Sequence, residues 1–195
     1  MTKVFLVHAG PTPWDAENRL VGAHSLPLTP QAAGAVQQWI DGLSEKVTAV
    51  YACLANEACH VVARMIGKHF SLRPRSRPEL EEVHLGLWRG LTREELEHRF
   101  GKVFALWMEQ PLSVEPPEGE SLVQAIERIG PALFKLLGRN DGGVVALPLR
   151  PLSLQIVAGL LRGENPEQIG NHLHWPPATE TIDFGVKAPD AHPGP

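Results

Sequence analysis

The residues best placed for chemistry lie at the end of the first apolar run. Val4-Phe5-Leu6-Val7 is a stretch of strand-forming residues, and His8 follows it directly, before a turn rich in Gly and Pro that ends at Trp14. This pattern predicts a buried strand that ends in a loop. Ligands of open α/β sheets bind at the carboxyl ends of strands. His8 is therefore expected to line a ligand pocket or to be a hydrogen-bonded imidazole.

The residues that could bind a metal form no recognisable site. Cys53, Cys59, His60 and His84 are the candidates, but the order Cys-x5-Cys-His matches no standard zinc spacing. In a helix over residues 56–70, Cys59 and His60 would point in different directions. A catalytic Cys53 would need a partnering His and a lowered pKa. We therefore expect no metal, no cofactor and buried, apolar cysteines.

The remaining chain alternates strands with helices. Strands are predicted over residues 47–52, 144–147 and 179–184, and helices over residues 30–43, 56–70, 92–100, 103–109, 121–137, 152–161 and from 165 onward. This alternation predicts a three-layer α/β/α sandwich with a mainly parallel central sheet. We expect residues 1–186 to form a single domain, with residues 71–120 as an insertion packed over the carboxyl edge of the sheet. The Pro-rich residues 187–195 are expected to form a flexible tail.

Length and composition bound the kind of protein. The 195 residues are 43% hydrophobic, which suits one globular domain with a sizeable core. The formal charge of −4 predicts no basic patch, so neither nucleic acid nor a membrane is expected as a partner. The first apolar run is too short for a signal peptide or a membrane span. Two cysteines make no disulfide framework, and a cytoplasmic location is the expectation.

The first motif resembles the signature of the histidine phosphatase (phosphoglycerate mutase-like) superfamily. There, two apolar residues precede Arg-His-Gly-Glu-Thr, a variable residue and often Trp. The matching positions are Leu6, Val7, Gly10, Thr12 and Trp14. The resemblance implies the fold of that superfamily and a site for phosphorylated substrates.

Three further segments extend the resemblance to about residues 3–185. Residues 18–22 and 26–29 are similar to a family loop that helps to enclose the substrate, and Arg19 lies in it. Residues 119–121 together with Arg128 match a family segment that opens a helix. A third motif fits at every spacing, with Leu80, Glu82, Gly86, Trp88 and Gly90. In the family, the glutamate at the position of Glu82 is often the general acid.

The polar residues that the resemblance would place in the pocket are mostly replaced. The position of the phospho-accepting histidine holds Ala9, and the arginine before it is His8. The second phosphate-binding arginine is Glu57, and the second histidine is Leu149. Of these positions, only Glu82 keeps the family residue. We interpret the losses as one event, in which selection on the pocket relaxed while selection on the fold persisted.

These replacements favour a catalytically inactive pseudoenzyme with a binding or regulatory role. The expected ligand-binding residues are Arg19, His8, Glu82 and Trp14, and the partner is an unknown small molecule or protein, with a homodimer left open. One alternative is a phosphatase or mutase with a rearranged site that uses His8 and Glu82, although Glu82 could simply cap the loop around Gly86. A second alternative is a structural partner subunit.

The resemblance also predicts geometry. Leu6, Val50 and Val145 should lie on adjacent central strands, with Ala9, Glu57 and Leu149 brought close together beyond their carboxyl ends. Arg19, without a phosphate, is predicted to form a salt bridge with Glu57, unless Glu57 turns outward into solvent. Trp14 and Trp88 are candidates for an exposed aromatic patch at the mouth of the site.

Overall fold

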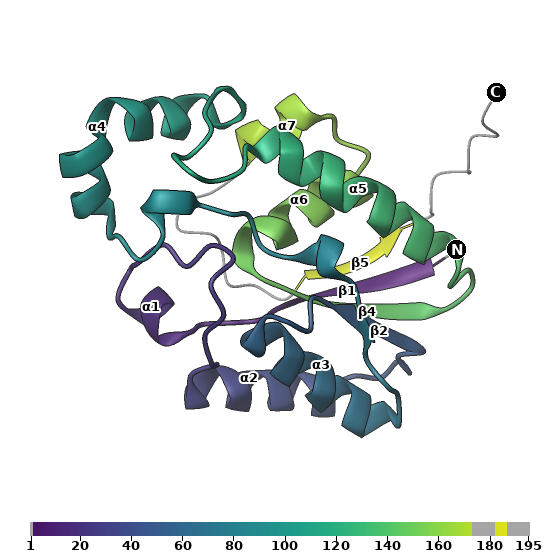
Figure 1. Cartoon of the computed structure of the whole chain (residues 1–195). Coiled ribbons are helices and arrows are strands. Elements are labelled where there is room, and N and C mark those ends of the chain that lie inside the picture. The colour runs from purple at the N-terminus through teal and green to yellow at the C-terminus, as the bar shows by residue number, and fades with distance from the viewer. Residues whose placement is uncertain (1, 173–181, 187–195) are drawn as a thin grey trace, which may run out of the picture.

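The computed structural model describes residues 2–172 and 182–186 (Figure 1). Its sheet has the strand order β3-β2-β4-β1-β5. The strands are β1 (Thr2–His8), β2 (Ala49–Ala52), β3 (Arg75–Ser76), β4 (Val144–Leu149) and β5 (Ile182–Val186). The first four strands in this order run parallel, and β5 runs antiparallel to β1. The predicted α/β fold with a mainly parallel sheet is confirmed.

Helices cover both faces of the sheet (Figure 1). Helices α2 (Pro30–Asp41) and α3 (Glu57–Phe70) lie on one face, and α5 (Leu122–Gly138), α6 (Pro151–Leu161) and α7 (Pro166–His172) lie on the other. Side chains alternate along β1, so that Leu6 joins the core under α5 and α6 while Phe5 and Val7 join the core under α2 and α3. The helix predictions rest on capping residues that the structure uses: Thr29 Oγ1 accepts from Ala32 N at 3.2 Å, for example.

The predicted arrangement of the central strands is also confirmed. Leu6, Val145 and Val50 lie on β1, β4 and β2, which are neighbours in that order. The register pairs His8 with Leu149. Beyond the strand ends, Ala9 N donates to the carbonyl oxygen of Leu149 at 2.8 Å. The carboxyl ends of β1 and β4, where the candidate site residues lie, are therefore side by side.

Residues 71–120 connect α3 to α5. They form β3, the short helices η1 (Pro78–Leu80), η2 (Gly86–Trp88) and η3 (Pro111–Ser113), and the long helix α4 (Arg93–Glu109). The two short helices predicted here are joined in α4, with a non-helical kink at Phe100. Part of this segment belongs to the sheet itself, because β3 pairs with β2.

Trp88 was expected at the mouth of the site, and this prediction is wrong. Its side chain is fully buried and meets the rings of Phe104 and Trp107 edge to face, each at a centroid distance of 5.7 Å. Aromatic pairs in this geometry add stability beyond the area that they bury. The loop position of Trp88 concealed this role, because its partners come from α4.

Two predictions fall partly or wholly outside the described residues. The last strand was expected at residues 179–184, of which 182–184 lie in β5 and 179–181 are not described. The tail at 187–195 is not described either. Among the described residues, no helix combines the length and apolarity needed to cross a membrane.

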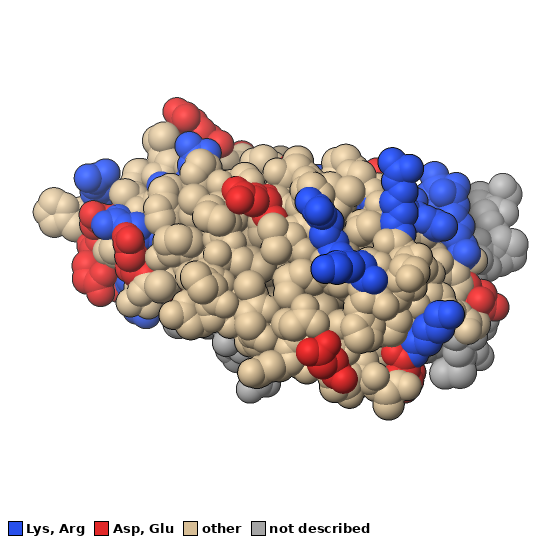
Figure 2. All heavy atoms as spheres, turned by 90° about the horizontal axis from the view of Figure 1, so that it is seen from below, with Lys and Arg blue, Asp and Glu red and all other residues tan. Residues whose placement is uncertain are grey.

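Charge is unevenly distributed over the surface. Figure 2 shows Lys and Arg side chains gathered on one half of the face that α2 and α3 form. The expectation of no basic patch, taken from the net charge of −4, is therefore wrong, because a sum over the chain hides where the charges lie. In the sequence, residues 64–77 hold five Lys and Arg residues and no Asp or Glu.

Candidate functional site

The candidate site lies where β1 and β4 end and α6 begins. The short helix α1 (Pro13–Ala16) closes it from the loop after β1. Gly10 is required at the turn, because a Cβ there would lie 2.6 Å from both Arg150 Nη1 and His8 Cε1. The side chains of His8 and Arg150 thus pack against the backbone of this loop. The site is built around these two groups.

Arg150 occupies the centre of the site, and sequence analysis missed it. Its side chain is only 1% exposed. One nitrogen, Nη2, donates to both carboxylate oxygens of Asp15, at 2.9 and 2.8 Å, and Nη1 donates to the carbonyl oxygen of Ala9. A charge-assisted pair of this kind is strong and directional. An arginine between an apolar strand and an apolar helix was the available signal, since such a charge needs a partner when buried.

Asp15 is the counter-charge of Arg150 and was also missed. Its Oδ2 accepts from the backbone N of Thr12 at 2.6 Å and from Thr12 Oγ1 at 2.7 Å. Burial favours the protonated acid, but the Arg150 charge and the Thr12 hydrogen bonds outweigh it and hold the pKa of Asp15 below its ordinary value. Asp15 is therefore an ionised carboxylate that neutralises the buried guanidinium.

His8 lies beside this pair as a neutral imidazole. It is buried, and its Nε2 has no hydrogen-bond partner. Burial and then the positive charge of Arg150 lower the pKa of His8 to about 4, against the opposing charge of Asp15. His8 therefore carries no charge at neutral pH and contributes nothing to binding an anion electrostatically.

Glu82 is fully enclosed and attached to the start of α6. Its Oε1 accepts from Val83 N and Ser153 N, and its Oε2 accepts from Leu152 N, each at 2.8 Å. Burial raises the pKa of Glu82, while these three amides and Arg150 act in the opposite direction. The alternative that Glu82 hydrogen-bonds the loop around Gly86 holds in part: Oε1 accepts from Val83 N in the segment before Gly86, and the other two bonds go to the N-terminus of α6. A carboxylate is favoured at such a helix end.

Arg19 does not pair with Glu57, so this prediction is wrong. Its Nη1 donates to the Gly90 carbonyl oxygen at 2.7 Å and to Glu95 Oε2 at 3.1 Å, and its Nε donates to Glu17 Oε2 at 3.0 Å. Glu57 instead lies exposed in the first turn of α3, where its backbone N donates to Ser25 Oγ at 2.8 Å. A negative charge in a first helical turn is stabilised by the helix dipole, and the exposed carboxylate of Glu57 is solvated by water, so it needs no cationic partner.

The other sequence-derived residues divide between the core and the rim. Ala9 and Leu149 are fully buried and lie in the two core clusters on opposite faces of the sheet. Trp14 is half-buried and stacks on His24 with ring centroids 4.8 Å apart. Trp14 thus remains a rim residue of the kind that was expected, and its ring also packs against Gly90.

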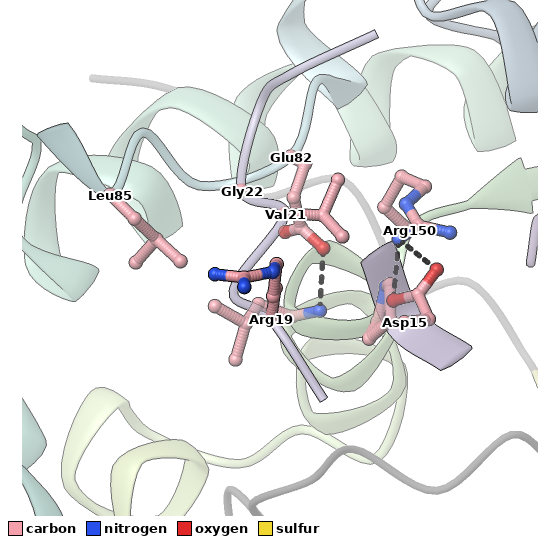
Figure 3. Close-up of a pocket in the computed structure, with 9 residues that line it drawn as sticks. Asp15, Arg19, Val21, Gly22, Glu82, Leu85 and Arg150 are labelled. Carbon is pink, nitrogen blue, oxygen red and sulfur yellow. Dashed lines mark hydrogen bonds and ion pairs between the residues drawn. The ribbon is translucent and has the colours of Figure 1, made fainter. Parts of the chain in front are cut away.

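The space left between these groups is small. Figure 3 shows Arg150 and Asp15 facing each other on one side of the pocket, with Glu82 across from them. The cavity has a volume of about 30 Å³, and its lining includes Arg19 and Leu85. Ligand pockets usually measure ~300 Å³ or more, so this cavity suits one or two water molecules. Neither His8 nor Ala9 lines it.

The described residues offer no metal site. They contain no group of three or more His, Cys, Asp or Glu that could hold an ion. Cys53 and Cys59 are free and buried, and burial raises the pKa of both thiols. A thiol with a raised pKa is a poor nucleophile.

Comparison with known families agrees with the fold and the motifs. A model of the histidine phosphatase superfamily (branch 1) matches residues 4–182. The chain belongs to this superfamily.

Individual relatives are distant. Phosphoserine phosphatase 1 of Hydrogenobacter thermophilus is 24% identical over 129 residues, which is 66% of this chain and 61% of that protein, less than two thirds of its length. YhfR of Bacillus stearothermophilus superposes with a TM-score of 0.79 at 20% identity, over 87% of this chain and 84% of that one. The alpha-ribazole phosphatase of Shigella flexneri gives a TM-score of 0.74 at 18% identity, over 87% and 84%. At such identities the structural likeness shows a shared fold.

Proposed function

We propose that this chain is a catalytically inactive histidine phosphatase-like protein with a binding or regulatory role. The observation that carries the proposal is the Arg150–Asp15 pair, which fills the centre of the site and binds the carbonyl oxygen of Ala9. The resemblance assigns the position of the phospho-accepting histidine to Ala9. An alanine side chain offers no nucleophile for a covalent intermediate.

The charges around the cavity support the same conclusion. Both lining arginines are already neutralised, Arg150 by Asp15 and Arg19 by Glu17 and Glu95. Glu82 adds a further negative charge. Two like charges at ~4 Å repel by roughly 4 kcal/mol at an effective dielectric constant of ~20. A phosphate dianion would therefore meet carboxylates without an available cation.

A second candidate function is a phosphatase with a rearranged site. The observation in its favour is the neutral imidazole of His8, whose Nε2 is unpartnered and could in principle attack phosphorus. Against it, His8 is absent from the lining of the cavity, and both oxygens of Glu82 already accept backbone amides. A general acid must reach the group that it protonates, and Glu82 would first have to leave α6.

Hydrolysis of p-nitrophenyl phosphate and phosphoserine by highly purified protein tests the proposal. We expect wild-type turnover to stay at background and to be unchanged in His8→Ala and Glu82→Ala. Turnover well above background that both substitutions abolish would overturn the proposal and establish the rearranged-site phosphatase. Turnover that neither substitution changes identifies a contaminating phosphatase and is consistent with the proposal.

Repair of the site gives a stronger test. Restoring the family residues through His8→Arg, Ala9→His, Glu57→Arg and Leu149→His should still give an inactive protein, because Arg150 and Asp15 occupy the space. Adding Arg150→Gly to these four should be required for any turnover. Activity in the four-residue variant without Arg150→Gly would show that Arg150 does not block the site.

A further inference from the structure

A cluster of cations lies away from the candidate site, beside the edge strand β3. Residues 58–78 contain Arg64, Lys68, Arg73, Arg75 and Arg77 and no Asp or Glu. We call these five residues the basic edge. In Figure 1, the carboxyl end of α3 lies at the opposite end of the molecule from α1.

The cations of the basic edge are solvent-accessible and largely free of carboxylates. Arg64, Lys68, Arg73 and Arg75 are exposed, and Arg77 is half-buried. None of the five forms an ion pair within the described part of the chain. Elsewhere on this protein, arginines do pair with carboxylates, as Arg93 does with Glu97. The basic edge is therefore an unneutralised positive surface.

Two of its guanidinium groups are held in place. Arg75 and Arg77 lie over the ring of Tyr51, at 5.5 and 5.0 Å from its centroid. Arg75 Nη1 also donates to the Tyr51 hydroxyl at 2.8 Å, and Asn140 Nδ2 donates to the same oxygen at 3.0 Å. Stacking fixes a guanidinium while leaving its outer N–H groups available. Less conformational entropy is then lost when these groups bind an oxyanion.

The cations lie on both sides of an open sheet edge. β3 is the last strand in the described sheet and pairs only with β2. Tyr51, under Arg75 and Arg77, belongs to the core on the α5 side, whereas α3, which carries Arg64 and Lys68, packs on the other face. An extended chain that lies along β3 could therefore meet cations on both sides. Exposed strand edges are common docking sites for extended peptides.

We propose that the basic edge binds an extended, acidic peptide segment of a partner protein. Carboxylates match the free arginine donors, and the strand edge suits an extended backbone. Nucleic acid fits less well, because the Tyr51 ring under Arg75 and Arg77 is 1% exposed and so cannot stack on a base. The inference is independent of whether the phosphatase site is active.

Fluorescence anisotropy with a labelled peptide of alternating Glu and Thr tests this proposal. Lys68→Glu combined with Arg73→Glu reverses two exposed charges without touching Tyr51. The matched control is Arg99→Glu with Lys102→Glu, two exposed cations of α4 that change the net charge equally. We expect the basic-edge variant to lose at least about tenfold in affinity and the control to lose less than about twofold. Thermal unfolding confirms that both variants fold.

Several results would overturn the proposal. Undetectable binding by wild type at low salt would do so, as would an equal loss in both variants. Tighter binding of a single-stranded oligonucleotide, abolished by the basic-edge variant, would assign the surface to nucleic acid. A wild-type dimer that the basic-edge variant converts to a monomer in sedimentation would assign it to a second copy of this chain. An alternating Lys and Thr peptide that binds as well as the acidic one would exclude charge recognition.

Discussion

Two arginine–carboxylate clusters lie near Glu82, one at the rim and one in the interior. At the rim, Arg128 donates to both oxygens of Glu120, at 3.2 and 2.5 Å, and to the carbonyl oxygens of Glu79 and Glu81. In the interior, Arg150 pairs with Asp15 next to Glu82. The side chain of Arg128 is 25% exposed, whereas that of Arg150 is 1% exposed.

The two clusters differ in how they relate to the family motifs. Glu120 and Arg128 match a family segment, and they still fix the loop before Glu82. Arg150 and Asp15 match none of the family motifs described above, and they line the cavity together with Glu82. Under the proposed function, the scaffold of the site is retained while its centre is replaced. The two clusters should also differ in energy, because the guanidinium of Arg150 is enclosed, whereas water reaches that of Arg128.

Breaking the Arg150–Asp15 pair should lower the free energy of unfolding more than the other substitutions described below. Asp15→Asn leaves the guanidinium of Arg150 buried without a counter-charge, and we expect it to lower the free energy of unfolding by about 3 kcal/mol or more. Urea unfolding at pH 7 measures this. The double variant Asp15→Asn with Arg150→Met should be more stable than Asp15→Asn alone, because no buried charge is then left unpaired.

The Asp15→Asn variant also tests whether Asp15 prevents phosphate from binding at Arg150. Inorganic phosphate should stabilise Asp15→Asn, in which Arg150 needs an anion, and should leave wild type unchanged. Equal stabilisation of both proteins would show that Asp15 does not block the site.

The next largest effect is the pH dependence of stability that His8 contributes beside the Arg150–Asp15 pair. The pKa of His8 falls from its ordinary value of 6.5 to about 4 on folding. Between these values the unfolded chain binds a proton that the folded chain does not, so the free energy of unfolding falls as the pH is lowered. The full contribution is about 3 kcal/mol. Urea unfolding between pH 7 and pH 4 should show a shallower decline for His8→Gln than for wild type, and identical slopes would contradict the assignment.

Much of the fold and little of the centre of the site could be predicted from the sequence. Strand positions and helix starts follow from local patterns, such as the apolar run before His8 and the cap at Thr29, and the adjacency of the three central strands follows from the family resemblance. The family spacing around Glu82 located its loop correctly. Arg150 was missed because its partner, Asp15, is 135 residues away, and no local pattern links them. Trp88 was misplaced for the same reason, since only the packing of α4 shows that it is buried.

A smaller loss of stability is expected when the carboxylate of Glu82 or of Glu120 is replaced by an amide. Glu82→Gln replaces one acceptor oxygen by an NH₂ group, which faces a backbone N–H and leaves a buried donor unpaired. We expect a loss of about 2 kcal/mol, against about 1 kcal/mol for Glu120→Gln, whose donors can turn to water. Thermal and urea unfolding of the two variants give the difference. A larger loss for Glu120→Gln would reverse the assignment of the interior cluster as the tighter one.

The smallest effect is expected outside both clusters, at Glu57. The resemblance places this residue at a phosphate-binding position, yet its side chain is exposed and contacts neither Arg19 nor Arg150. Glu57→Gln removes only a favourable charge from the first turn of α3, so the free energy of unfolding should fall by less than about 0.5 kcal/mol. Raising the salt concentration should shrink this difference further, because the helix dipole is screened at the surface. Urea unfolding at low and high salt checks both statements. A loss comparable to that of Glu82→Gln would mean that Glu57 has a buried partner, and that the closed centre of the site extends across to β2 and α3.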